Sequence, residues 1–385
     1  MSEQAMRIVF VIHGLTRGGA EAQLVYLTRE LAQRGHAVAI YLLNGDLDRL
    51  PELEGSGVHI EADRKRMKLD PGLLLRLARY IRQFRADVVQ GFLYDGNFYG
   101  RLAARMVGVP AFDSERNDNY QFNRFQKLGD LFTRHLTQGV VANSHSGARF
   151  AQNLYHFPEK RVHVVWNGIP IQAVDESVAT SYGDYRKAFF NRSDVRIAVL
   201  VGNIKPQKDY ELALDVANEL LSRDEHWCVL LVGDDIRGTE SYKQAILQRY
   251  ESHPYKNRIV FAGRRTDVLE IVSQCEVLFS TSLHEGFPNV VLEAMVVGTP
   301  VVSTEYSDIS MILPNAWQVV RQRDAVLVVD AIQRASQQRT SLAAVQRNWV
   351  EENASVAMST NRLLEIYRQQ GIRCADICEQ EQGCP

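Results

Sequence analysis

The amino-acid sequence alternates short apolar runs with longer amphipathic segments along most of its length. A β-branched and aromatic run at 7–12 is followed by a segment at 20–34 whose apolar residues recur at helical spacing. The alternation continues to 162–165, starts again at 197–201 and runs on to 301–302. Strands that alternate with helices of about ten to fifteen residues predict βαβ units, in which helices cover both faces of a parallel sheet. We therefore expect an α/β protein.

One segment, 167–194, interrupts this alternation and divides the chain. It contains two glycines and a proline, and we predict a single helix within it, near 185–190. A chain of 385 residues is long enough for two domains with a core in each. We predict the following parts: an α/β domain at 1–168, a second, similar one at 169–354, a C-terminal helix at 355–371, and a disordered polar tail at 372–385.

Composition places the chain among soluble globular proteins, with 45% hydrophobic and 23% charged residues. No apolar run approaches the roughly 18 residues of a membrane-spanning helix. The first residues lack the pattern of a signal peptide, and five scattered cysteines fit reduced thiols better than a disulfide framework. No set of histidines and cysteines has the spacing of a metal site. We therefore expect a cytoplasmic protein with no metal, no cofactor and no nucleic-acid partner.

Basic residues gather in the first half of the chain. Residues 1–168 hold 22 Lys and Arg against 17 Asp and Glu, a net charge of +5, whereas the remainder carries −7. The densest part, 61–85, has eight basic and three acidic residues and includes a helix predicted at 72–84. One face of that helix is apolar: Leu73, Leu74, Leu77, Ile81 and Phe84. A basic amphipathic helix can lie on an anionic membrane; the alternative is a helix that covers the sheet and leaves its arginines in water.

The stretch 280–302 combines a strand, a glycine turn and an apolar helix. Glu285 precedes the turn Gly286-Phe287-Pro288, and Glu293 lies within the helix predicted at 289–297. A helix start offers free backbone N–H groups and a positive dipole end to an anion. A carboxylate in apolar surroundings is costly without partners, and ligand hydroxyls would be suitable partners for Glu293. The alternative is that both glutamates are ordinary helix residues.

Two further strand-to-helix turns carry residues suited to phosphate. Gly14, Gly18 and Gly19 lie between the first strand and the first helix, where glycine lets a ligand approach the backbone. Their spacing is neither that of a dinucleotide fingerprint nor that of a P-loop. Lys205 and Lys208 lie in the corresponding turn of the second domain, where two cations suit a diphosphate. The alternatives are that the glycines form an ordinary turn that binds no ligand, and that the two lysines lie in a turn exposed to solvent.

Taken together, these motifs resemble those of glycosyltransferase family 4, which has the two-domain GT-B fold. The most specific match is EGFPNVVLEAM at 285–295 with GTPVV at 298–302, which resembles the family's pattern of two glutamates separated by seven residues. The resemblance covers residues 7 to about 370, with further matches at 18–21, 165–169, 202–208 and 261–267. It implies two Rossmann-like domains facing each other across a cleft, with the last helix crossing back to the first domain.

The resemblance also implies transfer of a sugar from a nucleotide-sugar to an acceptor hydroxyl, with retention of configuration and without a metal. Lys208 and the amides of Gly18 and Gly19 would hold the diphosphate, and Glu293 would accept hydrogen bonds from the ribose. The catalytic residues would be Glu285 and Arg116. The donor would also contact these residues: Asn203, Lys205, Arg264, Glu285, Gly286, Phe287 and Pro288.

Two positions depart from the family's usual pattern. Asn203 stands where an arginine commonly follows the glycine of the phosphate turn, and Lys205 could replace that arginine. Arg116 stands where many members have a histidine near the reacting sugar. An arginine there could stabilise the departing phosphate or an anionic acceptor, so the chemistry on the acceptor side stays open.

The expected partners are a nucleotide-sugar, with a UDP-sugar favoured, and a glycan or lipid-linked acceptor in the biosynthesis of a surface polysaccharide or glycolipid. Peripheral contact with the inner face of an anionic cell membrane would fit the basic first domain. Two other functions stay open: a GT-B epimerase that acts on the nucleotide-sugar itself, and a subunit that binds it without catalysis. The sequence names neither the base, the sugar, the acceptor, the linkage nor the oligomeric state.

Overall fold

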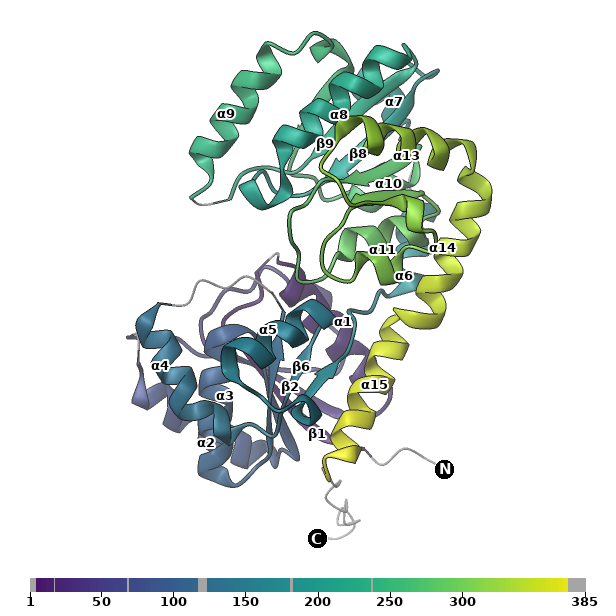
Figure 1. The fold of residues 1–385 in the computed structure, drawn as a ribbon. Helices are drawn as coiled ribbons and strands as arrows, with labels where there is room; N and C mark the ends of the chain where they lie inside the picture. Colours follow the sequence, from purple (N-terminus) through teal and green to yellow (C-terminus); the bar gives the residue numbers. More distant parts are fainter. Residues whose placement is uncertain are drawn as a thin grey trace. The chain divides into compact units, whose positions relative to one another are not determined.

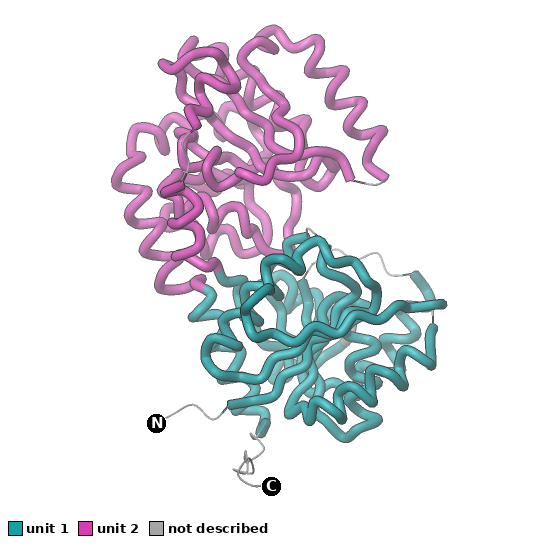
Figure 2. Tube along the Cα trace, turned by 180° about the vertical axis from the view of Figure 1, so that it is seen from behind, with its two compact units in different colours: residues 1–168, 356–385 teal, residues 169–355 magenta. Residues whose placement is uncertain are grey.

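The computed structural model describes residues 5–16, 18–67, 69–116, 123–180, 183–236 and 238–372 (Figure 1). The chain divides into two compact units. Unit 1 comprises residues 1–168 and 356–385, and unit 2 comprises residues 169–355 (Figure 2). The tail predicted to be disordered lies outside the described residues from position 373 onward.

Unit 1 is built on a parallel sheet that contains seven strands among the described residues. The strands span β1 (Arg7–Ile12), β2 (Ala37–Leu42), β3 (His59–Ala62), β4 (Val88–Gly91), β5 (Ala111–Glu115), β6 (Gly139–Ala142) and β7 (Val162–Val164). Their spatial order is β3-β2-β1-β4-β5-β6-β7. The chain starts at β1, adds β2 and β3 on one side of it, and then adds β4 to β7 on the other side. The gap between β1 and β4 is therefore the topological switch point, where open α/β sheets bind ligands.

Helices cover both faces of this sheet, because alternate residues of its central strand face opposite ways. Ile8, Phe10 and Ile12 pack with α1 and α15, while Val9 and Val11 pack with α2 and α3. The helices span α1 (Gly19–Gln33), α2 (Pro71–Phe84), α3 (Leu93–Val107), α4 (Arg124–Thr133), α5 (His145–Tyr155) and α15 (Val356–Gln369), with short 3₁₀ turns η1 (Leu50–Leu53), η2 (Arg134–Leu136) and η3 (Glu159–Arg161). α15 comes from the far end of the chain and completes this core.

The basic helix that the sequence offers to a membrane is α2, and its apolar face is not available. Leu73, Leu77 and Ile81 are fully buried against the sheet, whereas Arg79 and Arg82 point to solvent. The prediction that this face lies on a membrane is wrong, because the core of unit 1 already uses it. α2 is the sheet-covering helix of the alternative interpretation.

Unit 2 repeats the architecture with six strands among the described residues, all paired in parallel. Their order is β10-β9-β8-β11-β12-β13, which places the switch point between β8 and β11. The strands span β8 (Arg196–Val201), β9 (Trp227–Val232), β10 (Ile259–Gly263), β11 (Val277–Ser280), β12 (Val301–Thr304) and β13 (Val319–Val320).

The helices of unit 2 include three that the sequence pattern did not reveal, α6, α12 and α14. α6 lies in the segment 167–194, where only the helix at 185–190 was predicted; α12 is a single short turn of helix, and α14 directly precedes the predicted C-terminal helix. The helices span α6 (Ile171–Ala179), α7 (Tyr185–Phe190), α8 (Tyr210–Arg223), α9 (Glu240–Glu251), α10 (Val268–Ser273), α11 (Asn289–Val296), α12 (Ile309–Ile312), α13 (Ala325–Gln337) and α14 (Arg339–Asn353), with 3₁₀ turns η4 (Pro206–Lys208), η5 (Lys256–Arg258) and η6 (Ala316–Gln318). The prediction of two parallel-sheet α/β domains is confirmed.

Candidate functional site

The two turns that flank the switch point of unit 2 carry most of the predicted donor residues. One turn follows β8 and contains Lys205 and Lys208, and the other follows β11 and contains Glu285. Because β8 and β11 are paired in parallel, their carboxyl ends lie side by side and their turns meet. The backbone joins the two turns, since the N–H of Leu283 donates to the carbonyl of Gln207 at 2.8 Å.

Lys208 and Glu285 form an ion pair at the centre of this site. Lys208 Nζ lies 2.5 Å from Glu285 Oε1, and the two side chains are only 15% and 14% exposed. The hydroxyl of Ser282 donates to Glu285 Oε1 at 2.9 Å, and Gln207 Nε2 donates to the carbonyl of His284 at 2.6 Å. The carboxylate is therefore held in one orientation by three neighbouring groups.

Glycine at position 202 lets Lys208 reach this position. A Cβ at Gly202 would lie 2.8 Å from Lys208 Cε, so any larger residue would displace the lysine stem. The carbonyl of Gly202 also accepts a hydrogen bond from the hydroxyl of the buried Tyr210 at 2.6 Å, which fixes the end of β8 against α8. The glycine that directly follows β8 thus leaves room for the side chain of Lys208, six residues later.

Lys205 adds a second ammonium to the site. Its side chain is half-buried, and burial lowers the pKa of Lys205 below its usual range; Glu285 opposes this shift and Lys208 adds to it. Two ammonium groups thus lie near one carboxylate, and one positive charge is left over when all three are ionised. Bringing an anion to this turn would relieve the repulsion between the lysines.

The stretch 285–296 has a turn followed by a helix, as its sequence predicts. α11 begins at Asn289 with Pro288 as its N-cap, so Glu285 lies in the turn and Glu293 on the second helical turn. Glu293 is half-buried, and Phe287 is buried with 7% exposure. The carbonyl of Gly286 accepts a hydrogen bond from the hydroxyl of Ser307 at 3.0 Å, which ties the turn to the segment after β12.

Two other predicted donor residues lie outside this ion-pair cluster. Asn203 is on the same turn as Lys205, but its side chain is exposed. Arg264 follows β10, at the far edge of the sheet, and its guanidinium donates to the carbonyl of Asp235 at 3.4 Å. Neither forms a hydrogen bond or an ion pair with Lys208 or Glu285 in the part of unit 2 that the structure describes.

In unit 1, the predicted phosphate-binding glycines form the start of α1. Gly18 is the N-cap, and Gly19 is the first helical residue. The carboxylate of Glu21 folds back over Gly18, where a Cβ would come within 2.1 Å of Glu21 Oε2, and it accepts a hydrogen bond from the hydroxyl of Thr16 at 2.8 Å. A phosphate could bind here only if this carboxylate moved. The role of Gly18 and Gly19 stays a prediction.

A polar cluster that sequence reasoning missed lies at the switch point of unit 1. His13 directly follows β1, and Asp95 lies in the first turn of α3, just after β4. His13 Nδ1 lies 3.2 Å from Asp95 Oδ2, and Lys65 Nζ lies 3.0 Å from the same oxygen. Gly96 allows α3 to approach the sheet this closely, because a Cβ there would lie 2.2 Å from the carbonyl oxygen of Val11. The position of His13 at a strand end beside the switch point was the available signal.

The charges of this cluster shift two pKa values. The hydrogen bond to Asp95 raises the pKa of His13 above its usual value of 6.5. Burial raises the pKa of Asp95, but the bonds from His13 and Lys65 outweigh it and the net shift is downward. His13 is about half exposed, so a ligand hydroxyl could reach its ring. The arrangement is suited to hold a hydroxyl and exchange a proton with it.

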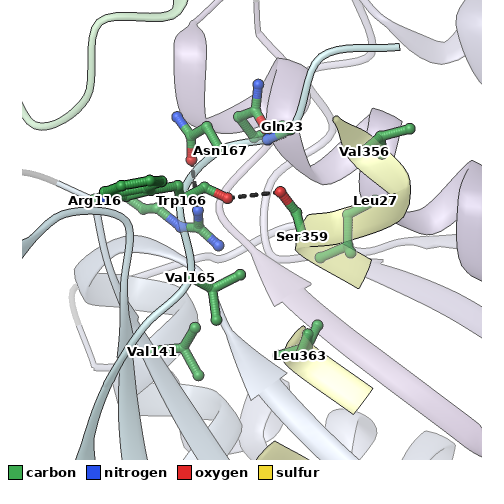
Figure 3. Close-up of a pocket in the computed structure, with 11 residues that line it drawn as sticks. Gln23, Leu27, Arg116, Val141, Val165, Trp166, Asn167, Val356, Ser359 and Leu363 are labelled. Atoms are coloured by element: carbon green, nitrogen blue, oxygen red, sulfur yellow. Dashed lines mark hydrogen bonds between the residues drawn. The ribbon is translucent and has the colours of Figure 1, made fainter. Parts of the chain in front are cut away.

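Arg116, the second predicted catalytic residue, points into a small pocket inside unit 1 (Figure 3). The pocket has a volume of about 20 Å³, room for a single water. The guanidinium stacks 4.4 Å from the ring centre of Phe92, and its Nη1 donates to Asn167 Oδ1 at 3.0 Å. The same segment is tied to α15 by the hydroxyl of Ser359, which donates to the carbonyl of Trp166 at 2.7 Å. These contacts give Arg116 a structural role, and its catalytic role stays a prediction.

Known proteins resemble the chain over both units. A family model described as "Glycosyltransferase Family 4" matches residues 17–173, and one described as "Glycosyl transferases group 1" matches residues 195–338. Escherichia coli UDP-Gal:alpha-D-GlcNAc-diphosphoundecaprenol alpha-1,3-galactosyltransferase is 19% identical over 76% of this chain and 78% of its own length. The putative glycosyltransferase EpsF of Bacillus subtilis is 25% identical over 79% and 80%.

Solved structures share the fold of the whole chain. HepE from Anabaena, in complex with UDP-glucose, has a TM-score of 0.80 and 17% identity, over 94% of this chain and all of that one. A glycosyltransferase from Rickettsia africae has a TM-score of 0.81 and 16% identity, over 95% of this chain and 98% of that one. Fold and motifs together define a glycosyltransferase of the GT-B fold. Within that class, the chain belongs to glycosyltransferase family 4.

None of the described helices is long and apolar enough to cross a membrane. No group of three or more His, Cys, Asp or Glu that could hold a metal ion occurs in the described ranges.

Proposed function

We propose that this chain transfers a sugar from a UDP-sugar to a hydroxyl of a lipid-linked or growing glycan, with retention of configuration and without a metal ion. The observation that carries the proposal is the pair of lysines beside one carboxylate at the switch point of unit 2. It supplies a fixed positive charge where an α/β sheet binds ligands. The UDP complexes of a structural neighbour support the choice of base.

In this proposal the donor lies along the turns of unit 2. Lys205 and Lys208 hold the diphosphate, Glu293 accepts from the ribose hydroxyls, and Glu285 orients the sugar. The bond between the anomeric carbon and the diphosphate oxygen breaks, a bond to the acceptor oxygen forms, and the acceptor's proton ends on the diphosphate or in solvent. The lysines lower the barrier because negative charge grows on the departing diphosphate.

The acceptor side belongs to unit 1 in this proposal. His13 and Asp95 lie at its switch point and would hold the acceptor hydroxyl, while Arg116 secures Asn167 by a hydrogen bond. Two relatives are named for sugars linked to diphosphoundecaprenol, and others for lipopolysaccharide core biosynthesis. These names favour an acceptor in surface polysaccharide or lipopolysaccharide biosynthesis, used at the cytoplasmic side of a membrane.

Nucleotide binding and sugar release test the proposal. Titration with UDP-, GDP- and ADP-sugars should give binding to a UDP-sugar, followed by slow release of its sugar when no acceptor is present. The rate should not change with a chelator, and NMR of the product should show the anomeric configuration of the donor. An absence of binding to any donor would contradict the proposal. Conversion of the donor to another nucleotide-sugar would instead assign epimerisation.

A further inference from the structure

The end of β12 places hydroxyl groups against the turn that carries Glu285. Because β12 is paired in parallel with β11, the carboxyl ends of both strands lie at the same edge of the sheet. The hydroxyl of Thr304, the last residue of β12, donates to the carbonyl of Ser282 at 2.8 Å. Ser282 in turn donates its own hydroxyl to Glu285 Oε1 at 2.9 Å. The turn is thus held from β12 at the residue that orients the carboxylate.

Two further hydroxyls of the same segment contact the turn on either side of the carboxylate. The hydroxyl of Ser307 donates to the carbonyl of Gly286 at 3.0 Å, and the hydroxyl of Tyr306 lies 3.2 Å from Ser280 Oγ. Tyr306 is buried, and burial raises the pKa of its hydroxyl, which therefore keeps its proton and can donate. We call the three residues of this segment the β12 hydroxyl cluster: Thr304, Tyr306 and Ser307.

Ser307 has a backbone conformation that a residue with a side chain rarely adopts. Its φ is +44°, in the left-handed region, where the Cβ of any residue other than glycine is crowded. Glycine would adopt this conformation freely. Strained residues persist where the surrounding structure holds them, and they gather at functional sites. The hydroxyl that bonds Gly286 is the contribution of the serine that a glycine could not make.

We propose that the β12 hydroxyl cluster positions the turn of Glu285 for sugar transfer, with Tyr306 and Ser307 as positioning residues. This inference rests on the proposed function, in which Glu285 orients the reacting sugar. The cluster acts through the turn, and the rate of a positioned reaction is sensitive to small displacements of the orienting group. Loss of one hydroxyl should therefore lower turnover, while the lysines still bind the diphosphate. A purely structural role would lower stability alone.

Tyr306→Phe removes one hydroxyl and keeps the buried ring. We expect kcat for a UDP-sugar to fall by about three- to tenfold, the effect of losing one hydrogen bond, while KM changes less than about twofold. The matched control is Tyr250→Phe, which removes a hydroxyl that bonds the carbonyl of Ile259, at the start of β10, at 3.2 Å. This control should turn over as the wild type does. Equal values of kcat for the two variants would overturn the proposal.

Ser307→Gly separates positioning from stability. Glycine relieves the left-handed backbone but cannot bond the carbonyl of Gly286, so the melting temperature should stay within about 3 °C of the wild type. The value of kcat should still fall by about three- to tenfold. A lower melting temperature with an unchanged kcat would show that Ser307 has a structural role only, and would overturn its part in the proposal.

Hydrogen exchange of the unliganded protein gives a readout that needs no transferase activity. In Ser307→Gly the amides of segment 283–287 should exchange roughly tenfold faster, while those of β8 and β9 exchange as in the wild type. Unchanged exchange at 283–287 would overturn the positioning of the turn by this cluster. A wild-type protein that releases no sugar from any donor would instead overturn the proposed function, so the two failures can be told apart.

Discussion

The two sheets present different charges at their switch points, although their architecture is the same. In unit 2, Lys205 and Lys208 face one carboxylate and leave one net positive charge when all three groups are ionised. In unit 1, Asp95 is shared by Lys65 and a histidine, so the charge of the cluster changes as His13 titrates. The difference suggests a division of labour. A net positive charge suits a diphosphate, and a histidine paired with a carboxylate suits a hydroxyl.

The largest effect is expected from Lys208→Gln, which removes the central cation of unit 2. The value of kcat/KM for the UDP-sugar should fall by about 100- to 1000-fold, the usual loss when one preorganised charge-stabilising donor is removed. Steady-state kinetics of sugar release or transfer would measure it. Lys187→Gln, which removes an exposed lysine of α7, is the control and should change the rate less than about threefold. Similar rates for the two variants would remove the basis for the donor assignment to unit 2.

Glu285→Gln should separate orientation from binding. We expect kcat to fall by roughly 10- to 100-fold while the donor Kd stays within a few-fold, because the lost carboxylate acts on the reacting sugar. Glu293→Ala should instead act on binding. It should weaken the binding of UDP by about five- to tenfold, which is the effect of losing one or two hydrogen bonds. Calorimetry and kinetics on both variants give the comparison. Equal, small effects from both would contradict these two roles.

Arg116→Gln tests whether the arginine of unit 1 is structural. Loss of the stacking on Phe92 and the bond to Asn167 should lower the free energy of unfolding by about 1–2 kcal/mol, measured by urea denaturation. We expect kcat to change less than about threefold when measured well below the melting temperature. A large loss of kcat with unchanged stability would instead make Arg116 catalytic.

The smallest effect is expected from Asp95→Asn, which removes the carboxylate that raises the pKa of His13. A raised pKa stabilises the fold at pH values below about 6.5, and this contribution is lost as the pH rises through the higher pKa of the folded state. The variant should therefore lose the contribution of His13 at mildly acidic pH, by less than about 1 kcal/mol because His13 is half exposed, whereas the pairing of Asp95 with Lys65 is lost at neutral pH as well. NMR titration of the His13 ring should show its pKa falling. An unchanged pKa would contradict the pairing.

The sequence was sufficient for the architecture, because strand and helix periodicities are local. The turn-and-helix boundaries around Pro288 and Asn289 could be predicted from the same local signals. Three helices were not predicted, and one of them, α12, has only four residues. α6 lies in a segment whose glycines and proline resembled a linker, and α14 has only a few buried residues, so its helical pattern is weak: Leu342, Gln346 and Val350.

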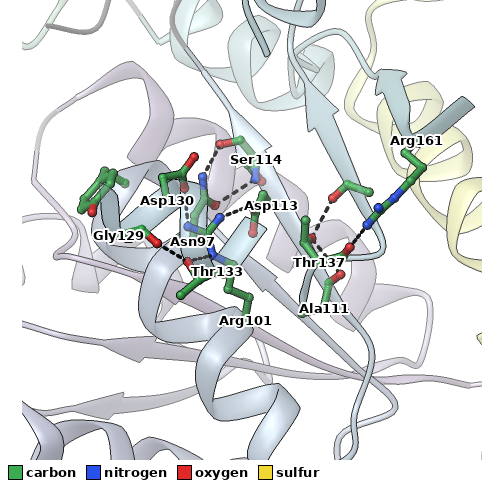
Figure 4. A network of polar contacts seen from close by, with 12 residues as sticks. Asn97, Arg101, Ala111, Asp113, Ser114, Gly129, Asp130, Thr133, Thr137 and Arg161 are labelled. Carbon is green, nitrogen blue, oxygen red and sulfur yellow. Dashed lines mark hydrogen bonds and ion pairs between the residues drawn. The ribbon is translucent and has the colours of Figure 1, made fainter. Parts of the chain in front are cut away.

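The contacts between distant residues could not be predicted from local patterns. The pairing of Lys208 with Glu285 depends on the adjacency of β8 and β11, and that of His13 with Asp95 on the adjacency of β1 and β4. The apolar residues of α2 fitted both a membrane surface and a sheet-covering face, because the sequence does not show which face the sheet covers. Likewise, the buried Asp130 of α4 pairs with Arg101 of α3, a partner that is known only once the chain has folded (Figure 4).

The most direct test of a diphosphate site in unit 2 is calorimetric titration of UDP and of uridine into the wild-type protein and into Lys205→Gln/Lys208→Gln. We expect the wild type to bind UDP at least about 100-fold more tightly than uridine, since only UDP presents charge to the lysines. In the double variant the two affinities should nearly coincide, while the affinity for uridine stays unchanged. A preference for UDP that survives the loss of both lysines would contradict the assignment.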